Sequence, residues 1–239
     1  MSNKDKKENY NENFNDYELN SLLYTNAMNY DKRNFLSYYI SLIRTKNILI
    51  FEFCKLKDYN SRLVKIDLFF ISLSFNYFIN TLFFNESIIH QIYEDDGIYN
   101  FSFLIPYISY SFVITHILII IIKYIFLSER NICEIKNENI LDKAYDKIGK
   151  VKKCIVIKYI CFFTIFSLIN IFFWYYLSSF GAVFQNTQIF LIENTLISFS
   201  FSLIFPLIFS ILSTIFRIYS LGKTNRECFY KISKIIQFI

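Results

Sequence analysis

Residues 172–188 read FFWYYLSSFGAVFQNTQ, and they hold the only tryptophan of the chain, a tyrosine pair, a glycine and a short amide-rich turn. Apolar segments lie on both sides of this stretch, which contains no Lys or Arg. Aromatic residues gather at membrane interfaces, and basic residues are retained on the cytosolic side. We therefore predict that the stretch is the turn between two membrane-spanning helices, at the face away from the cytosol, with Gly181 at the tight part of the turn.

The apolar residues of the chain come in long blocks. Of its 239 residues, 54% are hydrophobic and 21% are aromatic. A helix needs about 20 apolar residues to span a bilayer, and four blocks meet this length, at residues 63–84, 101–127, 154–177 and 189–221. We expect an all-α membrane protein in which residues 58–221 form a four-span helical bundle.

The segments that flank this bundle have a different composition. Residues 1–30 are polar and Asn-rich, without a signal-peptide pattern, and are expected to form a disordered tail. In residues 31–57, two apolar clusters flank Arg44 and Lys46, and each charge would cost roughly 2.5–3.5 kcal/mol at mid-bilayer. An amphipathic helix on the cytosolic membrane surface is therefore expected there, with a fifth span as the alternative. Residues 222–239 are predicted to form a second, basic amphipathic helix.

The positive charges predict the topology. The 25 Lys and Arg residues fall in three groups, at residues 4–65, 123–158 and 217–234, and the loops 85–100 and 178–188 contain none. With four spans all three groups lie on the same side, so both termini are predicted to be cytosolic. The basic residues flank apolar blocks, so we expect no nucleic acid as partner despite the net charge of +5. The expected partners are the lipid bilayer, anionic lipids of the cytosolic leaflet, and other membrane helices or a second copy of the chain.

The five cysteines fall in predicted cytosolic segments or in the cytosolic half of the third span. No disulfide framework is implied by this placement. Cys54, Cys154 and Cys228 lie next to predicted spans and are candidates for palmitoylation. The alternative is that they are free thiols used as small apolar side chains.

Polar residues recur on one stripe of each predicted span. The fourth stripe runs in three- and four-residue steps from Asn194 to Arg217. Such residues face other helices or a wet cavity, because polar groups are costly in lipid. The alternatives are interhelical hydrogen bonds, worth about 0.6 kcal/mol each, and a polar pathway or pocket. The candidates for such a polar bundle interior are Asn76, Asn80, Ser109, His116, Asn170, Asn194 and Ser198.

The predicted outer loops hold two weaker candidate sites. Glu86, His90 and Glu94 are spaced at i, i+4 and i+8, which would place an imidazole and two carboxylates on one helix face for a divalent metal. The alternative is an acidic loop without metal. In the second outer loop, Gln185, Asn186 and Gln188 are candidates for an outward recognition point. The alternative is that Asn186, Thr187 and Gln188 cap the fourth helix.

Five short motifs occur in order along the chain: DYNS at 58–61, IYED at 92–95, LSE at 127–129, FWYY at 173–176 and NTQ at 186–188. Together they resemble the C-terminal transmembrane module of large uncharacterised membrane proteins of protists, notably ciliates, over residues 30–239. The resemblance implies a polytopic anchor region with recognition domains upstream, and a chain that is a short member or a fragment. It brings no activity and no catalytic residues with it.

Three functions are compatible with these patterns. No zincin, P-loop, nucleophile elbow, CxxC or dinucleotide fingerprint is present, so we predict no cofactor and no catalytic residue, and we disfavour an enzyme. A non-catalytic anchoring or assembly module is favoured. The alternative is a subunit of a channel or transporter, suggested by the polar stripes and by Pro206. A lipid-modifying membrane enzyme that uses the acidic outer loop is the third.

Overall fold

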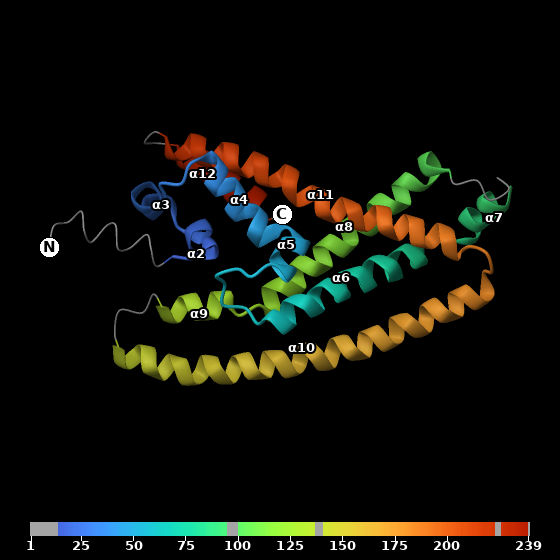
Figure 1. Ribbon diagram of the computed structural model, residues 1–239, viewed down its shortest axis with the longest axis horizontal. Helices are drawn as coiled ribbons and strands as arrows, with labels where there is room; N and C mark the ends of the chain where they lie inside the picture. The colour runs from blue at the N-terminus through green and yellow to red at the C-terminus, as the bar shows by residue number, and fades with distance from the viewer. Residues whose placement is uncertain (1–13, 95–99, 137–140, 223–225, 239) are drawn as a thin grey trace. The chain divides into compact units, whose positions relative to one another are not determined.

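The computed structural model describes residues 14–94, 100–136, 141–222 and 226–238 (Figure 1). Every regular element in these residues is a helix, which confirms the all-α expectation. The helices are α2 (Asp16–Ser21), α3 (Tyr24–Tyr30), α4 (Phe35–Lys46), α5 (Ile48–Phe53), α6 (Arg62–Phe83), α7 (Glu86–Glu94), α8 (Phe101–Phe126), α9 (Glu129–Lys136), α10 (Leu141–Val183), α11 (Gln188–Leu221) and α12 (Glu227–Phe238).

Four helices of the described residues, α6, α8, α10 and α11, are long and apolar enough to cross a membrane. They lie at the four predicted blocks, as expected for a multi-pass membrane protein. Helix α10 begins at Leu141, well before the predicted start at residue 154, so the charged linker and the third block form one helix. Gly149 lies inside this helix, where a glycine costs only about 1 kcal/mol relative to alanine and does not end it.

The chain divides into two compact units. Unit 1 consists of Met1–Ser61, Glu129–Asn137 and Leu203–Ile239, and unit 2 consists of Arg62–Ser128 and Glu138–Ser202. Helix α11 therefore contributes its first part to unit 2 and its last part to unit 1. This grouping by contacts differs from the predicted segments, which followed hydropathy alone.

Unit 2 has a core of aliphatic and aromatic side chains from α6, α7, α8, α10 and α11. One cluster includes Ile88, Leu104 and Phe180, and a second includes Leu68, Ile119 and Phe162. Helix α10 packs against α6 through aromatic rings, such as those of Phe78 and Phe173, whose centroids are 4.0 Å apart.

In unit 1, the residues expected to be a disordered tail form helices from Asp16 onward, so that expectation is wrong for residues 14–30. Asn15 and Glu18 form a reciprocal capping box at the start of α2, which satisfies backbone donors that a helix start leaves free. Ala27 of α3 is fully buried, and the ring of Tyr24 packs against that of Tyr230 in α12. Residues 1–13 lie outside the described residues. Tertiary contacts to α12 stabilise what local composition alone would leave unfolded.

The segment expected to be one amphipathic helix is broken into α4 and α5 at Asn47. The Asn47 side chain accepts a hydrogen bond from the backbone of Ile50 and donates one, 3.0 Å long, to the carbonyl of Leu203. The first bond caps α5, and the second attaches the break to the part of α11 that belongs to unit 1. Contact of α4, α5 and α12 with a membrane surface stays a prediction.

Candidate functional site

The buried polar side chains of unit 2 form a line on α6 that continues to α11. The Nδ2 atoms of Asn76 and Asn80 donate to the carbonyls of Ser72 and Asn76, at 3.0 and 2.8 Å. Ser198 then donates to Oδ1 of Asn76 across 2.9 Å, and this hydrogen bond joins the two helices. Asn194 is also buried, one helical turn before Ser198. The structure thus brings Asn76 and Ser198 into contact, and Asn80 lies one turn after Asn76 on the same helix.

The buried polar face of α8 is not the predicted one. Ser111 and Thr115 are buried, whereas Ser109 and His116 are half-buried and Asn170 of α10 is half-buried as well. Ser109 donates to the carbonyl of Ile105 in its own helix, and the His116 ring lies beside that of Phe112. Neighbouring positions of a helix point about 100° apart. The inward face of α8 is set by Ile108 and Thr115, so the residues that follow them turn away from it.

Two hydroxyls of this inward face have no hydrogen-bond partner in the part of the chain that the structure describes. They are Oγ of Ser111 and Oγ1 of Thr115, and both are buried. An unsatisfied buried polar group costs about 1–3 kcal/mol, so the site favours a water or another polar group beside these hydroxyls.

The second outer turn is built partly by its own amide residues. Asn186 adopts a positive φ of 67°, a conformation that asparagine tolerates well. Gln188 donates its amide to the carbonyl of Gly181 across 3.0 Å, and the Tyr93 hydroxyl donates to the carbonyl of Gln185 across 2.8 Å. Gly181 itself lies inside α10, so the expectation that it forms the tight turn is wrong; Asn186 does so. The side chains of Gln185, Asn186 and Gln188 are exposed.

The predicted metal site is not formed. His90 Nδ1 lies 3.2 Å from a Glu94 oxygen, and both side chains are exposed. Among the described residues, no group of three His, Cys, Asp or Glu could hold a metal ion. The side chains of the three lipidation candidates, Cys54, Cys154 and Cys228, are exposed.

Unit 1 holds an ionic cluster that sequence reasoning missed. Asp31 accepts two side-chain hydrogen bonds from Arg33, from Nε at 2.8 Å and from Nη2 at 2.9 Å. It accepts a third, also 2.9 Å long, from Nη2 of Arg217, whose side chain is 0% exposed. The only signal was Arg217 itself, at the end of the fourth polar stripe. Its partner lies in a segment far away in the sequence, which no periodicity could connect to it.

Aromatic and basic side chains complete this cluster. The Cζ atom of Arg217 lies 4.2 Å from the ring centre of Tyr230 and 5.3 Å from that of Tyr38, distances typical of cation–π contacts. Burial opposes the charged form of Asp31, but Arg33 and Arg217 outweigh it and hold the pKa of its carboxyl below the usual value. Burial and the charge of Arg217 lower the pKa of Lys234 to about 8. Lys234 is thus still mostly charged at neutral pH.

A buried carboxylate connects three further segments of unit 1. Glu129, at the start of α9, accepts hydrogen bonds from Nδ2 of Asn15 at 2.8 Å, from the backbone of Tyr59 at 3.3 Å and from Nδ2 of Asn60 at 2.6 Å. Burial, and then the charge of nearby Asp58, raise the pKa of Glu129 to about 7, although these hydrogen bonds favour its charged form.

In comparisons with known proteins, no family model, no curated protein and no solved structure matches the chain.

Proposed function

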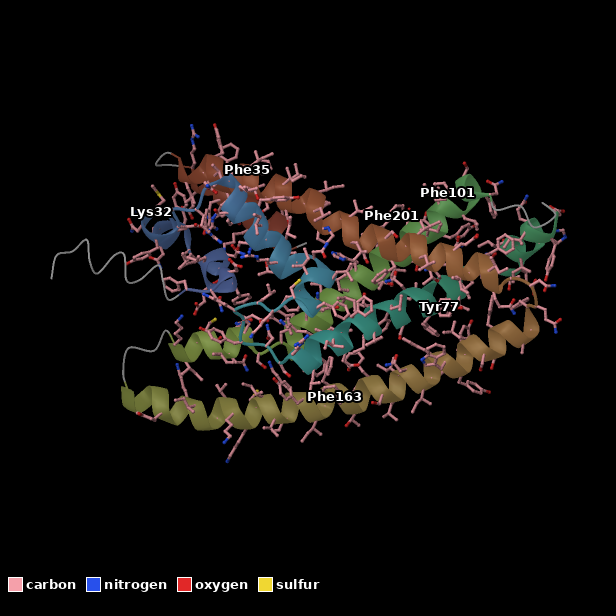
Figure 2. All side chains as sticks on the ribbon, viewed as in Figure 1. Lys32, Phe35, Tyr77, Phe101, Phe163 and Phe201 are labelled. Atoms are coloured by element: carbon pink, nitrogen blue, oxygen red, sulfur yellow. The ribbon has the colours of Figure 1, made fainter. Side chains whose placement is uncertain are left out.

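We propose that the protein is a non-catalytic membrane module that anchors and assembles with partner helices in a bilayer. The observation that carries this proposal is the exposed apolar surface of α10. Of its most apolar stretch only 11% is buried, against 39% in α6. Side chains project from the part of α10 on which they are drawn (Figure 2). Several of its apolar side chains, among them Ile160, Leu168 and Trp174, are more than 60% exposed.

The chemistry of this surface fits lipid and helix contacts better than water. A contiguous apolar surface of this size is a liability on a soluble monomer. In the hydrocarbon of a bilayer, exposure of this apolar surface carries no free-energy penalty. Helices associate there through packing and hydrogen bonds. The side of α10 that carries Phe162, Phe166 and Phe173 is occupied by unit 2 itself. The opposite side is left for lipid and for a partner helix. The three basic groups support a topology with both termini in the cytosol.

A photo-crosslinking experiment tests this proposal on the full chain expressed in membranes. The crosslinking residue replaces Leu168, which is 64% exposed, or Phe162 of the same helix, which is 0% exposed, as the matched control. We expect the protein to resist alkaline carbonate extraction and to crosslink from position 168 to another polypeptide, but not from position 162. Extraction by carbonate would refute the membrane assignment, and crosslinks to lipid alone would refute assembly.

A second candidate, a channel or transporter subunit, is supported by the buried hydroxyls of Ser111 and Thr115 and by the Asn76–Ser198 hydrogen bond. Flux assays in liposomes test it. Asn80→Leu changes a fully buried position and should abolish flux, whereas His116→Leu changes a half-buried one and should leave it intact. Absence of flux for any ion or small polar solute would refute this candidate.

A further inference from the structure

The ionic cluster of unit 1 contains more positive than negative charge. Arg33 and Arg217 both donate to the carboxylate of Asp31, and Lys234 is a third basic side chain of the cluster. Nζ of Lys234 lies 5.8 Å from the ring centre of Tyr230, which the guanidinium of Arg217 contacts at 4.2 Å. A buried charge without a partner costs several kcal/mol. An additional anion with about two negative charges would therefore balance the charge of the cluster.

Arg217 also has unused hydrogen-bond donors. Its Nη2 atom donates to Asp31 at 2.9 Å and to the carbonyl of Leu19 at 3.2 Å. Its Nε and Nη1 atoms have no hydrogen-bond partner within the described residues, although the side chain is fully buried. The hydroxyl of Tyr38, whose ring packs near this guanidinium, also has none there. A guanidinium has five N–H donors in its plane, so the ring contacts of Tyr38 and Tyr230 leave the unused ones available to an acceptor.

We propose that Arg33, Arg217 and Lys234, together with Tyr38, form a binding site for a phosphate group, of a lipid head group or of free phosphate. We call these four residues the Arg217 site. A phosphate monoester carries about −1.5 to −2 charge and three acceptor oxygens, which match the excess charge and the unused donors. Arginine is the side chain best suited to phosphate oxygens. A carboxylate ligand would neutralise only half of the excess.

Two of the basic side chains make the Arg217 site accessible to a phosphate group. Arg33 and Lys234 are half-buried, so both reach the surface of unit 1, whereas the side chain of Arg217 is fully buried. Lys234 at present donates to the backbone carbonyl of Asn20, a neutral acceptor that a phosphate oxygen would replace with a charged one. The site lies within unit 1 and recognises the phosphate group whether or not it belongs to a lipid, so this inference goes beyond the proposed function and is tested separately from it.

Isothermal titration of the full chain, purified in phosphate-free detergent buffer, tests the proposal. One arm adds inorganic phosphate, and the other adds a short-chain phosphatidylinositol phosphate, with short-chain phosphatidylcholine as the blank. We expect one saturable site. Binding of inorganic phosphate identifies free phosphate as a sufficient ligand, and binding of the phosphoinositide alone identifies a lipid head group. Absence of binding in both arms overturns the proposal, whatever the outcome of carbonate extraction.

Matched variants locate the binding. Lys234→Gln should weaken it about tenfold or more, because it removes one charge-assisted hydrogen bond. Lys231→Gln lies on the same helix, where Lys231 is exposed and paired with Glu227 at 2.9 Å, and it should leave the affinity unchanged. Equal weakening by both variants would mean attraction by overall charge and would overturn the site. Since Arg217→Gln perturbs a buried residue, the half-buried Lys234 carries the test, with hydrogen exchange of α12 as the check on folding.

Discussion

The substitution Asp31→Asn probes the buried ionic contact between Asp31 and Arg217. It keeps the shape of the side chain but removes the charge that faces Arg33 and Arg217. The Asp31 side chain is 2% exposed and that of Arg217 is 0% exposed, whereas that of Arg33 is 13% exposed. Arg33 can therefore recover some hydration after the substitution, and Arg217 cannot.

The expected magnitude follows from these contacts. A hydrogen bond to a charged group contributes about 1.5–3 kcal/mol net. Removing one partner of a buried ion pair costs about 3–5 kcal/mol, because the other charge is left uncompensated. Unit 1 should therefore open more easily by about 3–5 kcal/mol in the variant at neutral pH. Because the folded-state pKa of Asp31 is lowered, the wild-type contribution is present above the ordinary value of 3.8 and is lost as the pH falls through the lowered value.

Amide hydrogen exchange of α3 and α4, in the full chain in detergent, measures this opening free energy. The control is Asp16→Asn, because Asp16 makes an exposed ion pair with Arg44 at 3.7 Å. Exposed pairs contribute at most about 1 kcal/mol. If Asp31→Asn cost no more than Asp16→Asn, the cluster would not stabilise unit 1 and the reasoning would be refuted.

Glu129→Gln should remove a pH dependence from the hydrogen-exchange protection of α9. Folding raises the pKa of Glu129 from 4.5 to about 7. The protonated carboxyl therefore stabilises the folded state fully below pH 4.5, and this stabilisation is lost as the pH rises through 7. Hydrogen exchange across this range measures it, and equal pH slopes in both proteins would contradict it. A double-mutant cycle of Asn76→Leu and Ser198→Ala should give a coupling of about 0.6 kcal/mol in bicelles; no coupling would mean that their 2.9 Å contact does not hold the helices. In a cysteine-free background, Asn186→Cys should react with an impermeant thiol reagent from outside and Lys150→Cys should not, both positions being exposed. The opposite pattern would reverse the topology.

The long apolar helices were predictable because each depends on local composition. A block of about 20 apolar residues has one inexpensive arrangement in a bilayer, and α6 and α8 begin and end within a residue or two of the predicted positions. The stripe on α6 was also predictable, since Ser72, Asn76 and Asn80 recur at four-residue steps. On α8 the same reasoning chose Ser109 and His116, because a regular spacing of polar residues does not reveal which side of a helix faces its neighbour.

Sequence alone therefore determined the helical class, the four candidate spans and the segments that carry positive charge. The physical reason is the free energy of transfer, which favours apolar side chains in hydrocarbon and keeps charged ones in water. Tertiary structure alone decided that residues 14–30 are ordered and that Asp31 meets Arg217. It also placed the tight turn of residues 172–188 at Asn186 and not at Gly181. The physical reason is that a buried ion pair between residues far apart in the chain leaves no periodic pattern. Its partners are identified only when folding excludes water from both.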